Sequence, residues 1–144
     1  MNIFENKSIL VTGATGSFGQ HCVKKLLNHG KPRRLVIFSR DELKQFQMQQ
    51  ILPESKYPLR YFLGDIRDRE RLVRACAGVD IIVHAAAIKH ISAAEYNPTE
   101  CIETNIYGAK NIIDRKELET EPKLLSKGIW DGVVDTVGGN ILAN

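Results

Sequence analysis

Runs rich in aliphatic, β-branched and aromatic residues alternate with amphipathic segments along the chain. Each run has the length and character of a buried strand, and together they lie at residues 9–12, 35–38, 59–63 and 79–87. Segments with a helical period lie between and after them: one that follows Gly19, then 42–52, 69–76 and a long one from Asn97-Pro98 to about residue 113. This alternation predicts an α/β fold, a Rossmann-like doubly wound parallel sheet.

Right-handed crossovers predict the spatial order 3-2-1-4 for these strands. Residues 132–137 have the alternation and β-branching of a fifth strand beside the fourth. We therefore predict about five strands in the order 3-2-1-4-5, within a single domain over residues 1–144. Ligands of such sheets bind at the carboxyl ends of the strands, so the site is expected in the segments that follow them.

Three glycines follow the first strand directly and precede a helix. Gly13, Gly16 and Gly19 have the spacing G-x-x-G-x-x-G. Strand, glycine turn and helix in this order bring backbone N–H groups and a helix N-terminus against a pyrophosphate. We predict that Gly13 makes the tight turn, Gly16 lets phosphates approach, and Gly19 lets the helix lie close to the sheet. The alternative, a turn without a ligand, is disfavoured by the strand before it and the helix after it.

The end of the second strand holds the residues that would discriminate between two cofactors. An acidic residue there would accept a hydrogen bond from the ribose 2′-hydroxyl, whereas an arginine accommodates a 2′-phosphate. Ser39 and Arg40 occupy the strand end, and Lys44 lies one helical turn later. Arginine binds phosphate with a bidentate fork and lysine as a point charge, so we predict NADP rather than NAD. The alternative is that Arg40 is a surface charge beside a helix and Asp41 only an N-cap.

The third and fourth strands are also followed by candidate ligand contacts. Asp65 suits the amino group of an adenine, but it could equally cap the helix that starts near Asp68. The fourth strand ends in small residues, Ala85 and Ala86 among them, that would allow a ligand's close approach.

Two polar positions follow the fourth strand. Lys89 and His90 lie in the next loop, and we assign a cofactor or substrate role to Lys89 only. Asn105 lies in the middle of the predicted long helix. A polar side chain is unfavourable there unless it holds a backbone group.

Charge and composition exclude several functional classes. Apolar and charged fractions of 43% and 26% are those of an ordinary globular domain, and the net charge is only +3. Lys31, Arg33 and Arg34 form a small basic cluster without the aromatic residues of a nucleic-acid surface, so we expect a solvated loop and no nucleic-acid partner.

The cysteines and the longest apolar run point to a cytoplasmic protein. Cys22, Cys76 and Cys101 are odd in number and widely spaced, which favours reduced thiols over disulfides or a metal site. The run at 81–88 is interrupted by His84 and is too short to cross a bilayer. No basic and apolar leader opens the chain, so we expect neither export nor a membrane partner.

Five sequence runs resemble one family. They are Thr-Gly-Ala-Thr-Gly-Ser-Phe-Gly at 12–19, Ser-Arg-Asp-Glu-Leu-Lys-Gln-Phe at 39–46, Gly-Asp-Ile-Arg-Asp at 64–68, His-Ala-Ala-Ala-Ile-Lys-His at 84–90 and Ala-Glu-Tyr-Asn-Pro-Thr-Glu-Cys-Ile at 94–102. With Thr-Asn-Ile at 104–106, they are similar to the UDP-N-acetylglucosamine 4,6-dehydratases, extended short-chain dehydrogenase/reductases of bacterial surface-sugar synthesis. The likeness runs from about residue 4 to about 113.

This resemblance implies a set of NADP contacts. They are Thr15, Gly16, Ser17 and Phe18 in the glycine turn, Ser39, Arg40 and Lys44 after the second strand, Asp65 and Ile66 after the third, and Ala86 and Lys89 after the fourth. Gly13, Gly19 and Ala85 complete the predicted cofactor site.

The family's chemistry is oxidation of the sugar at C4, loss of water across C5–C6 and return of the hydride to C6. It needs a Tyr-x-x-x-Lys pair, because the lysine lowers the pKa of the tyrosine that takes the C4 hydroxyl proton. None of the four tyrosines has a lysine four residues later, and the sugar-binding lobe is also missing from this sequence. We therefore predict no catalytic residue and no metal ligand.

The sequence changes character from about Asp114. Trp-Asp-Gly-Val-Val-Asp-Thr-Val-Gly-Gly at 130–139 resembles the quinone-oxidoreductase and acryloyl-CoA-reductase branch of the medium-chain dehydrogenases. We predict a chimera of two nucleotide-binding segments, 1–113 and 114–144, joined near Ile113. A natural truncated or fused gene is the alternative.

These observations predict an NADP(H)-binding half-domain without its own catalytic apparatus. The alternative is a working or partner-completed nucleotide-sugar dehydratase or reductase. An open edge strand and a partly uncovered sheet face would favour self-association, so a homodimer is compatible with the sequence.

Overall fold

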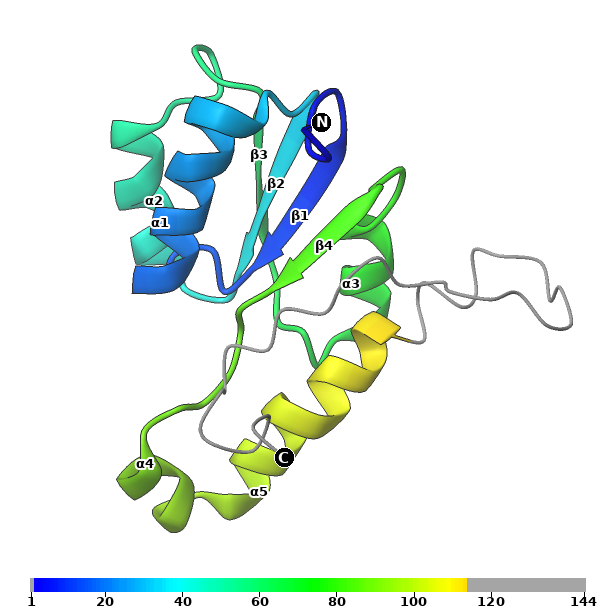
Figure 1. Ribbon diagram of the computed structural model, residues 1–144. Helices are drawn as coiled ribbons and strands as arrows, with labels where there is room; N and C mark the ends of the chain where they lie inside the picture. The colour runs from blue at the N-terminus through cyan, green and yellow to red at the C-terminus, as the bar shows by residue number, and fades with distance from the viewer. Residues whose placement is uncertain (1, 114–144) are drawn as a thin grey trace, which may run out of the picture.

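A computed structural model of the protein describes residues 2–113 and contains one parallel sheet (Figure 1). Its strands are β1 (Ser8–Thr12), β2 (Arg34–Ser39), β3 (Leu59–Leu63) and β4 (Ile81–His84). They lie in the order β3-β2-β1-β4, and each neighbouring pair is parallel. The predicted doubly wound parallel sheet is confirmed with this order. The predicted fifth strand, at 132–137, lies outside the described residues.

Helices cover both faces of the sheet. They are α1 (Ser17–Lys25) with the π-helical turn η1 (Leu26–Gly30), α2 (Glu42–Ile51), α3 (Arg69–Ala75), α4 (Ile91–Tyr96), and α5 (Pro98–Ile102) with the π-helical segment η2 (Glu103–Gly108). Helical backbone continues from η2 to residue 113. In Figure 1, α1 and α2 lie on one face, and α3 lies on the other beside the end of the long helix.

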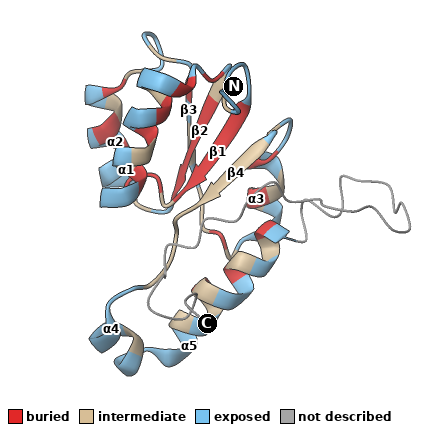
Figure 2. Ribbon diagram, in the orientation of Figure 1, coloured by how far each residue is buried: buried red, intermediate tan, exposed pale blue. Residues whose placement is uncertain are grey.

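The strands alternate their side chains between two apolar layers. Ile9 and Val11 of β1 pack with Val23 and Leu26 beneath α1, whereas Leu10 points to the opposite layer. That opposite layer contains Leu10, Val36, Phe38, Ile66, Leu72, Ala75, Cys76 and Ile112. Because successive residues of a strand face opposite sides, one continuous apolar run supplies both layers. Figure 2 shows the result: β1 and β2 are buried along their length.

The fourth strand is shorter than predicted. Its ladder ends at His84, rather than continuing to residue 87. The Thr12 side chain explains the early end, because its hydroxyl oxygen Oγ1 accepts hydrogen bonds from the amides of Ala85 and Ala86 at 3.1 and 3.3 Å. The Ala85 amide also donates to the Thr12 carbonyl of β1 at 3.2 Å, whereas the Ala86 amide is bonded to the Thr12 side chain.

The helical region after β4 differs from the prediction in two ways. Helix α4 was not predicted, and the long helix turns a different face inward. An α-helical period predicts that Ile102, Ile106, Ala109 and Ile113 face inward, but Ile102 and Ile106 are 46% and 59% exposed. Thr104, Gly108 and Ile112 are buried instead. These three buried positions also follow a four-residue helical spacing, so the period alone could not choose between the two faces; Asn105, which lies between them, bonds to Ile88 in the loop after β4.

Candidate functional site

The glycine turn after β1 is a tight, closely packed structure. Gly13 has a φ of +61°, and a Cβ atom there would lie 2.8 Å from the amide nitrogen of Ala86. A Cβ at Gly19 would collide with the carbonyl oxygen of Gly13. The predicted turn at Gly13 and close helix approach at Gly19 are both confirmed as geometry. The turn is thus pinned between the start of α1 and the end of β4.

The start of α1 is exposed, and its Gly16 amide donates to the Gly13 carbonyl at 3.0 Å. Its N-cap is Gly16, no side chain among the described residues caps it, and its first turn contains no acidic residue. Gly16, Ser17 and Phe18 are exposed, while Thr15 is buried and its carbonyl accepts from Gln20. A helix N-terminus carries partial positive charge and unpaired N–H groups, so this end of α1 suits an anion.

The end of β2 holds one buried and two exposed candidates. Ser39 is buried, and its hydroxyl accepts from Gln45 of α2 at 3.1 Å. The side chains of Arg40 and Lys44 are each 58% exposed. Lys44 lies 3.4 Å from Asp41, and Asp41 also accepts from the Lys44 amide as the N-cap of α2. The interpretation of Asp41 as an N-cap is therefore confirmed, and both cations remain accessible to a ligand.

Asp65 is the centre of a charged network at the same edge. Its Oδ2 accepts from Arg67 Nε at 3.0 Å and from Arg67 Nη2 at 2.7 Å, and it lies 3.6 Å from Arg40 Nη1. Burial alone would raise the pKa of Asp65, but hydrogen bonds from Arg67 and the nearby guanidinium charges hold it below the ordinary value. Asp68, rather than Asp65, caps α3 through the Arg71 amide at 2.9 Å, so the alternative of Asp65 as that cap is wrong.

The end of β4 joins the glycine turn through Thr12 and His84. Thr12 Oγ1 lies 2.7 Å from His84 Nδ1. Because both lone pairs of this oxygen already accept backbone amides, its hydrogen is left for Nδ1, which makes the imidazole neutral with its proton on Nε2. Burial, and then the charge of Lys89, lower the pKa of His84 and favour the same neutral form.

The loop after β4 is held by the long helix. Asn105 Oδ1 accepts from the Ile88 amide at 2.8 Å, and Asn105 Nδ2 donates to the Ile88 carbonyl at 2.9 Å. The prediction that Asn105 needs a backbone group to hold is confirmed. Lys89 follows directly and is exposed, so its ammonium group is presented from an anchored backbone. Ala85 and Ala86 are partly buried beside Gly13.

One candidate belongs to the core. Ile66 is 4% exposed, its side chain fills the space above Gly108, and its carbonyl accepts from Asn111 at 3.0 Å. The important residues that sequence reasoning missed are Thr12, His84, Gln45 and Arg67. A polar residue at the end of an apolar strand was the available signal for Thr12. For Arg67 the sequence offered only its position two residues after Asp65.

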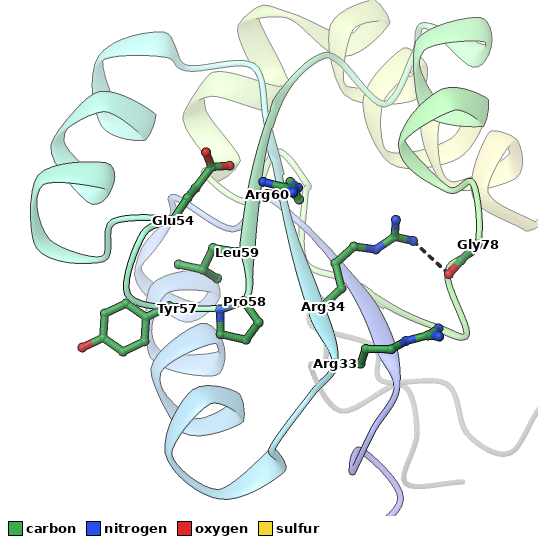
Figure 3. A pocket seen from close by; sticks show the side chains of 8 residues that line it. All are labelled: Arg33, Arg34, Glu54, Tyr57, Pro58, Leu59, Arg60 and Gly78. Atoms are coloured by element: carbon green, nitrogen blue, oxygen red, sulfur yellow. Dashed lines mark hydrogen bonds between the residues drawn. The ribbon is translucent and has the colours of Figure 1, made fainter.

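The described residues also form a cleft at the opposite edge of the sheet (Figure 3). Its volume is about 530 Å³, and its lining includes Arg33, Arg34, Tyr57 and Arg60. None of the predicted site residues lines it. Within residues 2–113, no group of three or more His, Cys, Asp or Glu side chains could hold a metal ion, and no helix is long and apolar enough to cross a membrane.

Comparison with known proteins assigns the chain to a family. A family model described as "Polysaccharide biosynthesis protein" matches residues 9–121. The chain belongs to this family. The match extends past the predicted junction near Ile113. The separate origin of residues 114–144 stays a prediction.

Relatives and solved structures agree with this assignment. The UDP-N-acetylglucosamine 4,6-dehydratase (inverting) of Campylobacter jejuni subsp. jejuni is 55% identical over 112 residues, covering 78% of this chain and 33% of that protein. The structure of Pen from Bacillus thuringiensis has 38% identity and a TM-score of 0.74, covering 78% of this chain and 34% of that one. The dTDP-glucose 4,6-dehydratase DesIV from Streptomyces venezuelae, solved with NAD and TYD bound, has 29% identity and a TM-score of 0.66, covering 75% of this chain and 35% of that one.

The resemblance to the UDP-N-acetylglucosamine 4,6-dehydratases is therefore confirmed for the N-terminal part of the chain. The chain spans about one third of the length of the curated relatives it matches.

Proposed function

We propose that this chain binds NADP(H) at the carboxyl edge of its sheet, as the dinucleotide-binding part of a nucleotide-sugar dehydratase. One observation supports this most strongly: the uncapped N-terminus of α1 opens at the same edge as Asp65 and Arg40. An anion-binding helix end, a carboxylate and an accessible guanidinium match the pyrophosphate, adenine and phosphorylated ribose of one molecule.

Each part of the dinucleotide has a group of suitable chemistry. The amides of Ser17 and Phe18 would hold the pyrophosphate, since these residues are exposed at the positive end of α1, while the Gly16 amide donates to the Gly13 carbonyl. The Asp65 carboxylate would accept from the adenine amino group. Arg40, with Lys44 beside it, would bind the 2′-phosphate, because no acidic residue follows β2 directly.

The residues around β4 would orient the cofactor rather than react with it. Thr12 and His84 fix the position of the glycine turn relative to Ala85 and Ala86. Lys89, exposed beside the clamp at Asn105, would add a positive charge near the bound anion. When bound, the nicotinamide supplies the hydride acceptor.

We expect no turnover from these 144 residues alone. No tyrosine in the sequence has a lysine four positions later, so the usual base for the sugar hydroxyl is not provided. The contrary hypothesis, a working or partner-completed dehydratase, is favoured by the 55% identity to the Campylobacter enzyme. Incubation with UDP-N-acetylglucosamine and mass spectrometry for the loss of water separates the two, since turnover would refute a purely binding role.

Calorimetric titration with NADPH, NADH and ADP-ribose tests the binding itself. Wild-type protein should bind all three ligands and NADPH most tightly. Arg40→Asp should lower NADPH affinity more than NADH affinity, because it replaces the 2′-phosphate partner with a like charge. Arg74→Asp, exposed in the last turn of α3 two turns from Arg67, makes the same charge change and should alter both affinities little and equally. Equal losses in Arg40→Asp would refute the assignment of the 2′-phosphate to Arg40.

A homodimer is a further part of this proposal. Ile102, Ile106 and Tyr107 are large apolar residues that are exposed along α5 and η2. A row of such residues favours association. Sedimentation equilibrium at micromolar concentration should give twice the monomer mass, whereas a monomer across the concentration range would refute it.

A further inference from the structure

Two arginines compete for one carboxylate oxygen at the carboxyl edge. Arg67 donates to Asp65 Oδ2 through both Nε and Nη2, at 3.0 and 2.7 Å. Arg40 approaches the same atom only to 3.6 Å, an ion-pair distance without a hydrogen bond. Two donors fill the two lone pairs of one oxygen, so Arg67 leaves no free position on Oδ2 for Arg40.

The other oxygen of Asp65 is half occupied. Oδ1 accepts from the Arg67 amide at 3.0 Å, which leaves one lone pair free. A ligand amino group could use this lone pair without displacing any bond of Arg67. The arrangement of Arg67 is thus compatible with a ligand on Asp65.

Arg67 itself is fixed from a third side. Its Nη1 donates to Glu100 of α5 at 2.7 Å, and its side chain is only 32% exposed, against 58% for Arg40. Charge-assisted bonds from a guanidinium fork are the strong class of hydrogen bond, so Arg67 is the arginine that stays with Asp65. Arg40 is left as the more accessible cation of the pair.

We propose that Arg67 is a specificity-determining positioning residue: by saturating Asp65, it keeps Arg40 free to bind the 2′-phosphate of NADP(H). This inference rests on the proposed function of the same site. The position of α5 thereby becomes linked to cofactor choice, because Glu100 holds the guanidinium that occupies Asp65.

Removing Arg67 should therefore weaken NADPH selectivity without touching the phosphate-binding residue. In Arg67→Gln, the unsatisfied carboxylate of Asp65 attracts Arg40, and the 2′-phosphate must break that new pair. We expect the ratio of NADPH to NADH affinity, measured by calorimetry, to fall about three- to fivefold. Asp65→Asn in the same chain removes the competing charge, so the double variant should regain most of the wild-type ratio even if its absolute affinities fall.

Two further variants separate this mechanism from simpler causes. Arg74→Gln removes the same charge from the exposed last turn of α3 and should leave the ratio unchanged. Arg67→Lys keeps the charge but lacks the two parallel donors of a guanidinium, so the ratio of NADPH to NADH affinity should fall about twofold. If thermal melts show that Arg67→Gln is unfolded, the ratio in Arg67→Lys tests the proposal instead.

The possible failures are distinguishable. If the wild-type protein binds neither dinucleotide, the proposed function fails and this inference fails with it. If the wild-type protein binds but folded Arg67→Gln keeps its ratio, only the inference is overturned. An equal fall in Arg74→Gln, or no recovery in the double variant, would also overturn it.

Discussion

The two edges of the sheet use their arginines and backbone groups in opposite ways. At the amino edge, Arg34 donates to Ser8 Oγ at 2.7 Å and to the carbonyls of Ala77 and Gly78 at 2.7 and 2.9 Å. At the carboxyl edge, Arg40 makes no hydrogen bond with any described residue, and the start of α1 has no cap. The first edge satisfies Arg34 internally, whereas the second leaves Arg40 and the start of α1 available to a ligand.

For ligand binding, the availability of hydrogen-bond donors matters more than the volume of a cleft. The cleft of about 530 Å³ lies at the amino edge, yet one of its arginines already has protein acceptors (Figure 3). We therefore expect substitutions at the amino edge to lower stability and leave dinucleotide affinity intact. Substitutions at the carboxyl edge should lower dinucleotide affinity and leave stability intact, except where the backbone itself is strained.

Gly13→Ala should have the largest effect on stability. It should also be the exception to the difference between the edges, because it should lower both stability and NADPH binding. A φ of +61° is strained for alanine, and the new Cβ would lie 2.8 to 2.9 Å from the backbone of Ala85 and Ala86. We expect the free energy of unfolding to fall by about 3 kcal/mol, together with loss of NADPH binding. Urea denaturation and calorimetry measure the two effects.

Gly16→Ala is the matched control for that change. Gly16 has a φ of −73°, which alanine adopts freely, and the nearest contact of a Cβ would be 3.3 Å. The free energy of unfolding should change by less than about 1 kcal/mol, while NADPH affinity falls because the methyl group stands among the exposed amides. Equal loss of stability in the two variants would contradict the assigned roles.

Arg34→Ala should show the amino-edge behaviour most clearly. Losing three hydrogen bonds from a charged donor should lower the free energy of unfolding by about 2 kcal/mol, with the NADPH dissociation constant unchanged. Arg33→Ala is the control, since Arg33 is 61% exposed and lies 3.7 Å from Asp80. It should cost about 0.5 kcal/mol or less. A weakened NADPH affinity in folded Arg34→Ala would contradict the separation of the edges.

Tyr61→Phe tests stability along β3, away from both groups of donors. The Tyr61 hydroxyl donates to the Leu52 carbonyl at 2.8 Å, and its removal should lower the free energy of unfolding by about 1 kcal/mol. Burial, and then the charge of Glu54, raise the pKa of Tyr61 to about 12.

The raised pKa gives this residue a pH signature. In the unfolded chain the Tyr61 hydroxyl ionises near pH 10. Its contribution to the free energy of unfolding is therefore complete below pH 10 and is lost as the pH rises toward 12. The stability difference between wild type and Tyr61→Phe should therefore shrink over that interval in thermal melts. A constant difference from pH 8 to 12 would contradict the assignment.

Lys31→Gly should have the smallest effect, and it should be stabilising. Lys31 follows η1 with a φ of +48°, a left-handed conformation that glycine adopts without strain. We expect a gain of about 0.5 kcal/mol, because relief of strain exceeds the added entropy of the unfolded chain. Lys31→Ala removes the same charge but keeps a Cβ, so a gain of equal size there would point to charge instead.

Much of the described fold follows from local patterns. The strand positions and both apolar layers are encoded in short runs such as Ile9–Val11, where alternate residues face opposite helices. The end of β4 and the inward face of the long helix are not encoded locally. They depend on Thr12 reaching Ala85 and on Asn105 reaching Ile88, contacts that form only after the chain has folded.

The candidate site divides in the same way. Gly13 and Gly19 could be predicted because their geometry follows from one turn between a strand and a helix. The partner of Asp65 could not be predicted, because Arg40, Arg67 and the start of α3 are all suitable partners for a carboxylate. Only the distances in the folded chain identify Arg67 as that partner. Ile66 follows Asp65 directly in the sequence, but its side chain belongs to the core.

Amide hydrogen exchange with and without NADPH tests the central claim most directly. Binding should slow exchange at residues 16–19 and 64–66, on the carboxyl edge, and leave residues 31–34 at the amino edge unchanged. Slowing confined to the amino edge, or no slowing at residues 16–19 at saturating NADPH, would contradict the account.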